Sequence, residues 1–208
     1  MSTKNARRSH DQRRDSVETI PARQRSAPGV RLLVWGAALV ALAGIVTAMV
    51  LTSRPESSSA TRPAPDFTLS DTAGHQVRLS DYVGKSNVVL YFSEGAGCQS
   101  CLVQMREIEK DRTAFARDNI TVLPIVMNDR SQITADMATN GVSTPFLLDD
   151  GTVSKAYDTL GKGMHAGLPG HSFVLIDKQG TQRWYGEYPS MWLDPKDLLN
   201  EIESHLAG

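Results

Sequence analysis

The chain has 208 residues, enough for one domain with a substantial core and additional segments. Its formal net charge of −1 conceals an uneven distribution: residues 1–31 hold eight of the 22 basic and three of the 23 acidic residues, a net charge of +5. The other 14 basic and 20 acidic residues give the remainder a net charge of −6, which argues against a nucleic-acid-binding body.

The basic segment, residues 1–31, interleaves its charges with Ser and Gln and contains no aromatic residue. This composition is typical of a disordered tail that helps to orient a membrane protein. A contact with nucleic acid or with lipid head groups is the alternative interpretation.

An uncharged apolar run follows at residues 32–51. A helix of this length spans about 30 Å, the hydrocarbon thickness of a bilayer, so we expect a single transmembrane helix. A buried core helix or a cleaved signal peptide are the alternatives, but the apolar part of a signal peptide has only about 7–15 residues. The basic excess before the run predicts a cytoplasmic N-terminus, a protein of the cell membrane, and a body outside the cytoplasm.

Residues 52–64 are rich in Ser and Pro and lack apolar periodicity, which predicts a linker. A domain is expected over residues 65–208. It begins with two short strands near 67–69 and 77–79 that form a hairpin. The next strand, at 88–92, is apolar throughout, as is typical of a strand covered on both faces.

The second half of the domain alternates helical and strand patterns. Apolar residues from Leu102 to Phe115 have helical spacing and predict a helix packed on the sheet. A strand is expected at 121–127, where Pro124 indicates an edge, a bulge or a later start. The remaining expected elements are a helix at 131–140 ending at Gly141, a strand at 145–148, a helix from about 153 to 160, a hairpin of 172–177 and 181–185, and a closing helix capped by Asp194 with Pro195 first. This order predicts an α/β fold with a central mixed sheet and helices on both faces.

The only two cysteines, Cys98 and Cys101, stand where the strand at 88–92 gives way to a helix. Unpaired N–H groups and the positive end of the helix dipole favour a thiolate there, so Cys98 is the expected nucleophile. Cys101, one turn further on, is placed to resolve its mixed disulfide. A structural disulfide would close a longer loop and a structural zinc site would need two more ligands, so we expect a redox-active pair.

Five segments of the domain carry a resemblance to a known family. They are Ala-Pro-Asp-Phe-Thr-Leu at 64–69, Val-Arg-Leu-Ser-Asp-Tyr at 77–82, the strand before Cys98, Thr-Pro-Phe-Leu-Leu-Asp at 144–149, and Pro-Gly-His-Ser-Phe-Val-Leu-Ile-Asp at 169–177. In this order they resemble the thioredoxin-like superfamily, in the branch shared by AhpC/TSA redoxins and membrane-anchored TlpA/ResA-like thiol-disulfide oxidoreductases. The resemblance covers residues 65–206 and implies a three-layer α/β/α sandwich.

The resemblance implies further site residues. In that family a cis-proline lies against the cysteine pair, and Pro169 holds the matching position. Backbone before a cis-proline can pair with an extended substrate, which would place Leu168 and His171 in a substrate groove. Gly97 stands where TlpA-like proteins carry an aromatic residue and leaves more room beside the thiol, so we expect it to contact the substrate together with Leu168 and His171. Glu94 is the nearest candidate for the family's buried acid, with a solvated loop carboxylate as the alternative.

The expected activity is thiol-disulfide exchange, in which Cys98 attacks a disulfide of a partner protein and Cys101 releases the reduced partner. No cofactor beyond the cysteine pair is expected. By analogy with the anchored relatives we expect reduction, with electrons from a membrane-bound or thioredoxin-type donor.

A peroxidase is the first alternative. Peroxiredoxins place Thr or Ser three residues before the attacking cysteine, to hold the peroxide, whereas this chain has Gly95 there. The missing hydroxyl weakens the peroxidase interpretation.

Copper handling is the second alternative. Cys98, Cys101 and His171 would supply soft ligands for Cu(I), with Met164 or His165 in addition. The resembling copper proteins separate their cysteines by three residues, whereas here two residues intervene.

Overall fold

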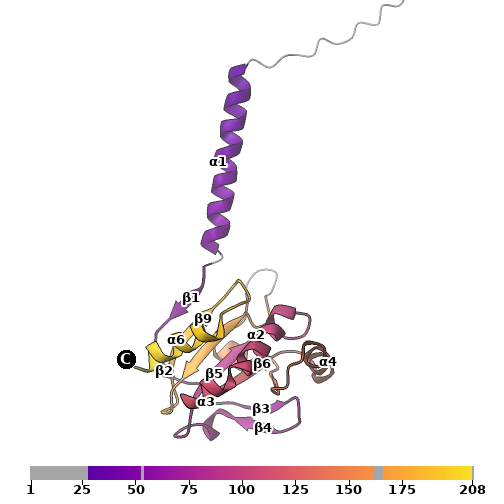
Figure 1. The fold of residues 1–208 in the computed structure, drawn as a ribbon, viewed down its shortest axis with the longest axis vertical. Helices are drawn as coiled ribbons and strands as arrows, with labels where there is room; N and C mark the ends of the chain where they lie inside the picture. Colours follow the sequence, from indigo (N-terminus) through magenta and orange to yellow (C-terminus); the bar gives the residue numbers. More distant parts are fainter. Residues whose placement is uncertain (1–27, 53, 162–165, 208) are drawn as a thin grey trace, which may run out of the picture. The chain divides into compact units, whose positions relative to one another are not determined.

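The computed structural model describes residues 28–52, 54–161 and 166–207 (Figure 1). The chain divides into two compact units, residues 1–47 and 48–208, which are described separately. Helix α1, Pro28–Thr52, makes up the described part of the first unit and continues into the first residues of the second. Within it, Leu32–Leu51 is long and apolar enough to cross a membrane, and none of this segment is buried by other parts of the protein. The helix predicted at residues 32–51 is therefore confirmed as a helix.

One mixed sheet organises the second unit. At its centre, β5 (Asn87–Phe92) runs parallel to β6 (Ile120–Val126) on one side and antiparallel to β8 (Ser172–Ile176) on the other. The strand order is β1-β9-β8-β5-β6-β7-β3-β4, and β2 also pairs with β9. The other strands are β1 (Glu56–Ser58), β2 (Arg62–Pro63), β3 (Thr68–Asp71), β4 (Gln76–Arg78), β7 (Leu147–Leu148) and β9 (Thr181–Glu187). The buried central strand and both predicted hairpins are confirmed.

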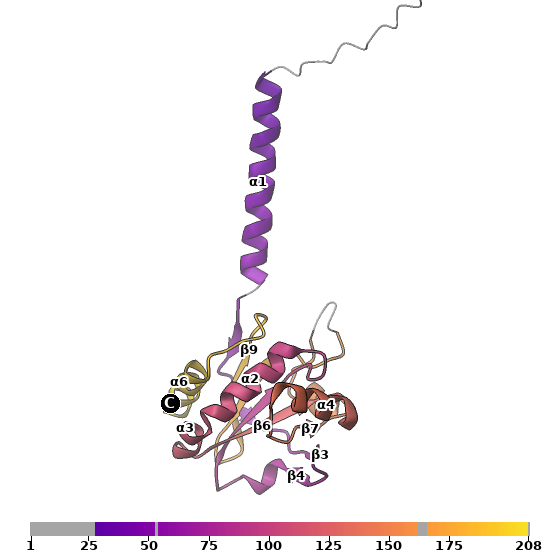
Figure 2. The same ribbon diagram turned by 45° about the vertical axis from the view of Figure 1, so that its right-hand side comes forward.

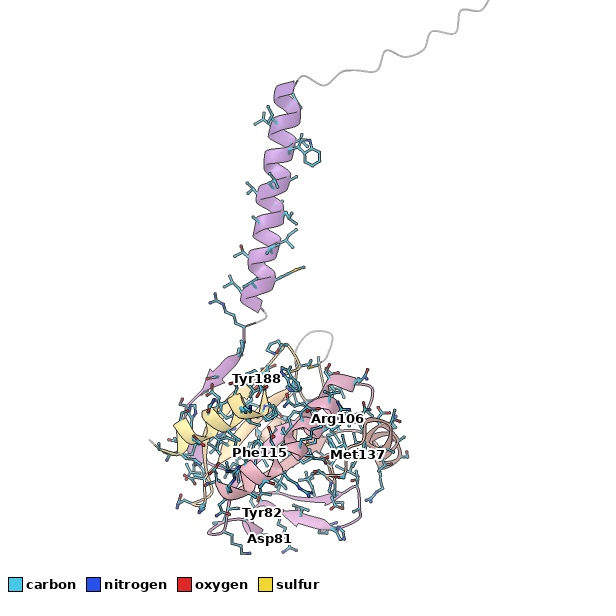
Figure 3. All side chains as sticks on the ribbon, viewed as in Figure 1. Asp81, Tyr82, Arg106, Phe115, Met137 and Tyr188 are labelled. Atoms are coloured by element: carbon cyan, nitrogen blue, oxygen red, sulfur yellow. A yellow bond between two sulfur atoms is a disulfide. The ribbon has the colours of Figure 1, made fainter. Side chains whose placement is uncertain are left out.

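Two layers of apolar side chains lie on the two faces of this sheet. Alternate residues of β5 point to opposite faces, so that Val89 and Tyr91 enter one layer and Val88, Leu90 and Phe92 the other. The first layer is covered by α2 (Gln99–Lys110), α3 (Arg112–Arg117), α4 (Arg130–Asn140) and α6 (Pro195–Leu206), shown in Figure 2. Figure 3 labels Phe115 of α3 and Met137 of α4 among the side chains of this layer. The second layer includes Val153 of α5 (Thr152–Ala156), so helices cover both faces, as predicted.

Part of the predicted linker belongs to the sheet. Strand β1 pairs with β9 from Glu56 to Ser58, and β2 pairs with the same strand at Arg62 and Pro63. These contacts are made by backbone groups, which need no alternation of apolar side chains. The absence of such alternation therefore misled the prediction that residues 52–64 form a free linker, and the ordered domain begins before residue 65.

Two predicted helices have different limits in the structure. The helix predicted through Phe115 is divided into α2 and α3 at Asp111, whose backbone departs from helical geometry at φ −93° and ψ 10°. Helix α5 ends at Ala156 rather than near residue 160, because Asp158 adopts a left-handed conformation with φ 57°. Two other limits agree with the predictions. Helix α4 stops at Gly141, with φ 68°, and α6 starts after Asp194, whose side chain accepts a hydrogen bond from the Lys196 N–H.

Pro124 is accommodated without a late start of its strand. Strand β6 begins at Ile120, and Pro124 pairs with Tyr91 of β5 on one side. The pairing with β7 on the other side includes only Ile125 and Val126. At Pro124 the strand thus has a single neighbouring strand, the kind of place where a missing N–H is tolerated.

Candidate functional site

The cysteines form a disulfide at the junction of β5 and α2. After Phe92 the chain turns through residues 93–97, and Cys98 becomes the N-cap of α2. The Cys101 N–H donates to the Cys98 carbonyl at 3.0 Å and to its Sγ at 3.3 Å. The two Cα atoms are 5.3 Å apart. The predicted place of Cys98 at a helix N-terminus is confirmed, and the same N–H groups favour its thiolate in the reduced protein.

The two sulfurs differ in accessibility. Cys101 is fully buried in the first apolar layer, whereas Cys98 is half-buried and packs against the edge of that layer. The intervening Gln99 and Ser100 are exposed. Cys98 is therefore the more accessible sulfur of the pair.

Two polar side chains from other elements hold the loop that leads to Cys98. The Asn128 side chain, just after β6, accepts a hydrogen bond from the Ala96 N–H at 2.8 Å. Asp136 of α4 accepts one from the Gly97 N–H, also at 2.8 Å. Nothing lies within 4 Å of the position that a Cβ of Gly97 would occupy, so the space predicted beside the thiol is present.

Gly95 lies at the crowded side of the same loop. Its φ is +69°, and a Cβ there would lie 2.1 Å from the Asn128 Oδ1 and 2.6 Å from the Val126 Cγ1. Only glycine combines this backbone conformation with the absence of a side chain. The hydroxyl that peroxiredoxins carry at this position is thus missing, and the loop has no space for it.

Replacing Gly95 with Ala should destabilise the folded domain by about 2 kcal/mol, because the methyl group would meet both the Asn128 amide and Val126 in a strained backbone conformation. Thermal unfolding of the full-length protein in detergent measures this effect. Gly97→Ala is the matched control, since Gly97 shares a positive φ of +88° but has open space around it. Equal destabilisation by the two substitutions would contradict the proposed crowding at Gly95.

His171, just before β8, contacts Cys101. The imidazole is 2% exposed, and its Nδ1 lies 3.9 Å from the Cys101 Sγ and 3.2 Å from the Tyr91 hydroxyl oxygen. Burial lowers the pKa of His171 to about 4. This position corrects the expectation that His171 lines a substrate groove, because the side chain lies beneath the surface.

Tyr91 is a site residue that sequence reasoning missed. It is fully buried in β5, where its hydroxyl donates to the Cys101 carbonyl at 3.1 Å, and burial raises its pKa above the ordinary value. Its place within a run of apolar residues favoured a purely hydrophobic role. The available signal was the hydroxyl itself, because a buried tyrosine usually requires a polar partner.

The segment around Pro169 pairs with Leu160 and Gly161, which follow α5. Pro169 is buried and forms an isolated bridge with Leu160. The carbonyl of Leu168 accepts a hydrogen bond from the Gly161 N–H at 2.8 Å, so this carbonyl is engaged within the chain rather than free for a substrate. The Leu168 side chain is 39% exposed and remains accessible. The cis form of Pro169 stays a prediction.

The structure does not test the remaining candidate residues. Glu94 is half-buried in the loop before Cys98, and its role as an acid stays a prediction. Met164 and His165 lie outside the described residues. Within the described part of the chain, no group of three or more His, Cys, Asp or Glu side chains could hold a metal ion. The Cu(I) alternative stays a prediction.

Comparisons with known proteins agree with this geometry. A model of the AhpC/TSA family matches residues 60–185. The chain is 29% identical over 119 residues to the thiol-disulfide oxidoreductase ResA of Geobacillus kaustophilus, a match that covers 56% of this chain and 63% of that protein. The chain thus spans less than two thirds of the length of the curated relatives that it matches.

Solved structures with the same fold include two peroxiredoxin-type proteins. The reduced 2-Cys peroxiredoxin of Plasmodium vivax aligns with a TM-score of 0.64 and 20% identity, over 72% of this chain and 98% of that one. Peroxidoxin BcpB of Mycobacterium tuberculosis aligns with a TM-score of 0.59 and 18% identity, over 72% and 96%. At these identities the likeness concerns the fold, and the predicted thioredoxin-like α/β fold is confirmed.

Proposed function

Because the chain belongs to the AhpC/TSA family, we propose that it is a thiol-disulfide oxidoreductase that reduces disulfides of partner proteins. The observation that carries the proposal is the unequal accessibility of the two sulfurs: Cys98 is half-buried at a helix N-terminus and Cys101 is fully buried behind it. This arrangement supports attack by Cys98 and resolution by Cys101.

The reaction proceeds in two exchanges. The Cys98 thiolate attacks one sulfur of the partner's disulfide, forming a mixed disulfide and releasing the partner's other sulfur as a thiolate that takes a proton from water. Cys101 then loses its proton and attacks the Cys98 Sγ, which displaces the partner's second thiolate. The partner gains two electrons and two protons, and the protein is left with the Cys98–Cys101 disulfide.

Reduction rather than oxidation is supported by the analogy with the anchored relatives and by the neutral pair Gln99 and Ser100, which brings no cation next to Cys98. A strongly stabilised thiolate would instead favour an oxidant. The reduction potential of the pair distinguishes the two directions, since thioredoxin lies at about −270 mV and the oxidant DsbA at about −120 mV. A potential near that of DsbA would overturn the proposed direction.

The proposed location is the cell membrane, with α1 in the bilayer, the N-terminus in the cytoplasm and the catalytic domain outside. Support comes from the apolar segment Leu32–Leu51 and from the basic excess that precedes it. An oxidising compartment requires a donor that keeps the pair reduced, and we propose a membrane-bound or thioredoxin-type protein. Labelling of the reduced cysteines in intact cells by a membrane-impermeant thiol reagent tests the side, and an absence of labelling would contradict it.

A shallow cavity next to Cys98 supports a polypeptide as substrate. It encloses about 240 Å³ and is lined by Gln99, Ser100 and Val103 of α2 together with Ser190, Met191 and Trp192. Trp192 is 40% exposed and offers an apolar surface in this cavity, which begins at the residue that follows Cys98. A segment of the partner protein that lies here would bring its disulfide to Cys98.

A peroxidase is the second candidate, because the family and the structural relatives include peroxiredoxins. Against it stands Gly95, where a hydroxyl-bearing side chain would overlap Asn128 and Val126. The rates of peroxide consumption and of protein-disulfide reduction, measured with the same thiol donor, separate the two activities. Faster turnover with peroxide would reverse the order of the candidates.

Trapping of a mixed disulfide tests the assigned roles. Full-length protein with Cys101→Ser, reduced and mixed with insulin, should form a covalent adduct through Cys98 because the resolving thiol is absent. The adduct is detected on non-reducing gels and by mass spectrometry, and it should disappear with dithiothreitol.

Cys98→Ser is the matched control. It retains the Cys101 thiol, but that sulfur is fully buried, so the yield of adduct should fall to background. Adduct formation through Cys101 at a comparable yield would show that the two roles are reversed.

A further inference from the structure

The buried imidazole of His171 lies next to the Cys101 sulfur, and the proposed exchange does not yet use it. Its Nδ1 lies 3.9 Å from the Cys101 Sγ. Its ring meets Tyr91 and Phe173 edge-on, with ring centroids 5.1 and 5.7 Å away and interplanar angles of 69° and 80°, and these two rings stack on each other at 4.9 Å. These aromatic contacts hold the same ring nitrogen toward the sulfur.

The hydrogen bonds around this ring indicate which nitrogen carries the proton. Tyr91 has a single hydroxyl proton, and it donates to the Cys101 carbonyl, which cannot donate in return. The 3.2 Å contact between the Tyr91 oxygen and Nδ1 is then a hydrogen bond only if Nδ1 is protonated. The reverse assignment would leave an N–H at Nε2, which is buried and has no hydrogen-bond partner among the described residues. A buried nitrogen lone pair costs less than an orphaned N–H, so Nδ1–H is the favoured tautomer.

The imidazole is neutral at physiological pH. Burial is the cause that lowers the His171 pKa to about 4. The polar groups that face the ring are the Tyr91 hydroxyl from β5 and the Cys101 sulfur from α2, and neither carries a charge in the oxidised protein. A neutral Nδ1–H therefore lies within reach of both the Tyr91 oxygen, at 3.2 Å, and the Cys101 sulfur, at 3.9 Å, over the whole physiological range.

We propose that His171 is a catalytic residue of the resolving step, in which its Nδ1–H donates a hydrogen bond to Cys101 Sγ as that sulfur becomes a thiolate. This inference rests on the proposed function, since it concerns the second exchange. Because Cys101 is buried in an apolar layer, its thiolate would otherwise be strongly disfavoured. The donor makes the thiolate accessible without placing a second charge in the core.

The step balances without proton transfer to the imidazole. The Cys101 thiol gives its proton to water, the thiolate attacks the Cys98 Sγ in the mixed disulfide, and the bond from Cys98 to the partner sulfur breaks. The partner leaves as a thiolate with the electron pair of that bond, and His171 keeps its Nδ1 proton throughout. The chemical contribution of His171 is therefore hydrogen-bond donation to the forming anion.

The reagent 5,5′-dithiobis(2-nitrobenzoate) separates the two exchanges in one experiment on reduced, full-length protein in detergent. Attack by Cys98 releases the first thionitrobenzoate, and resolution by Cys101 releases the second. With His171→Leu, stopped-flow absorbance should show an unchanged first phase and a second phase slowed about tenfold, the contribution of one hydrogen bond to a charged group. His171→Asn, whose amide N–H can occupy the place of Nδ1–H, should recover most of the second-phase rate.

The variants distinguish the failure of this inference from that of the proposed function. A second phase that is equally slow in Leu and Asn would assign the effect to packing and overturn the inference, as would a wild-type rate in His171→Leu. The Cys98→Ser variant tests the proposed function separately, since it should lose the first phase. Circular dichroism of each variant establishes that the rates compare folded proteins, and Asn against Leu remains decisive because both replace the imidazole.

Discussion

Replacing Cys98 with Ser should reduce the rate of insulin disulfide reduction by at least about a thousandfold. A serine hydroxyl does not form the anion that a thiolate provides at neutral pH, and Cys101 is fully buried and cannot take over the first attack. The measurement is the steady-state rate with dithiothreitol as donor, using full-length protein in detergent and subtracting the rate of dithiothreitol alone.

Cys101→Ser is the informative control for this loss. It keeps the accessible nucleophile, and dithiothreitol from solution can replace the missing resolving thiol, so part of the activity should remain. The expected order of rates is wild type, Cys101→Ser and then Cys98→Ser. Undiminished activity in Cys98→Ser would exclude the proposed chemistry, and equal loss in both variants would exclude the division of roles between the sulfurs.

The elements that were predictable from sequence are those whose side chains carry a periodic signal. The fully apolar run of β5, the hairpin of β8 and β9, and the Asp194-Pro195 start of α6 appear where their patterns place them. The pairing of β1 and β2 with β9 was not predictable in this way. Those strands contribute backbone hydrogen bonds to an existing strand, and their Ser- and Pro-rich side chains leave no pattern in the sequence.

The same distinction applies to the candidate site, where local features were predictable from sequence and long-range contacts were not. Two cysteines at a strand-to-helix junction are a local signal, so the predicted place of the pair was correct. The contact of His171 with Cys101 joins residues 70 positions apart, and Asp136 reaches Gly97 across 39 positions. No local pattern encodes such contacts. The first arises because the pairing of β5 with β8 places Ser172 opposite Phe92, and the second because α4 packs beside α2. For this reason a buried histidine was mistaken for a residue of the substrate groove.

The burial of His171 should also make the oxidised protein sensitive to acid. In the folded state its pKa is about 4, whereas its ordinary value is 6.5. Between these pH values the unfolded chain binds a proton that the folded protein does not bind, so the free energy of unfolding decreases as the pH falls. The contribution is fully present above about pH 6.5 and is lost progressively toward pH 4, a total of about 3 kcal/mol.

Thermal unfolding of the oxidised full-length protein at pH 7 and pH 4.5 measures this loss, with the disulfide intact so that neither cysteine titrates. The wild type should lose roughly 5–10 °C more than His171→Asn between the two pH values, as expected for a domain of this size. The asparagine variant removes the titrating group, so carboxylates and the other histidines contribute equally to both proteins and cancel in the comparison. Equal shifts in the two proteins would mean that the imidazole is protonated in the folded state at pH 4.5. A charged ring would make the hydrogen bond to Cys101 depend on pH and would contradict the neutral donor that the burial of the ring implies.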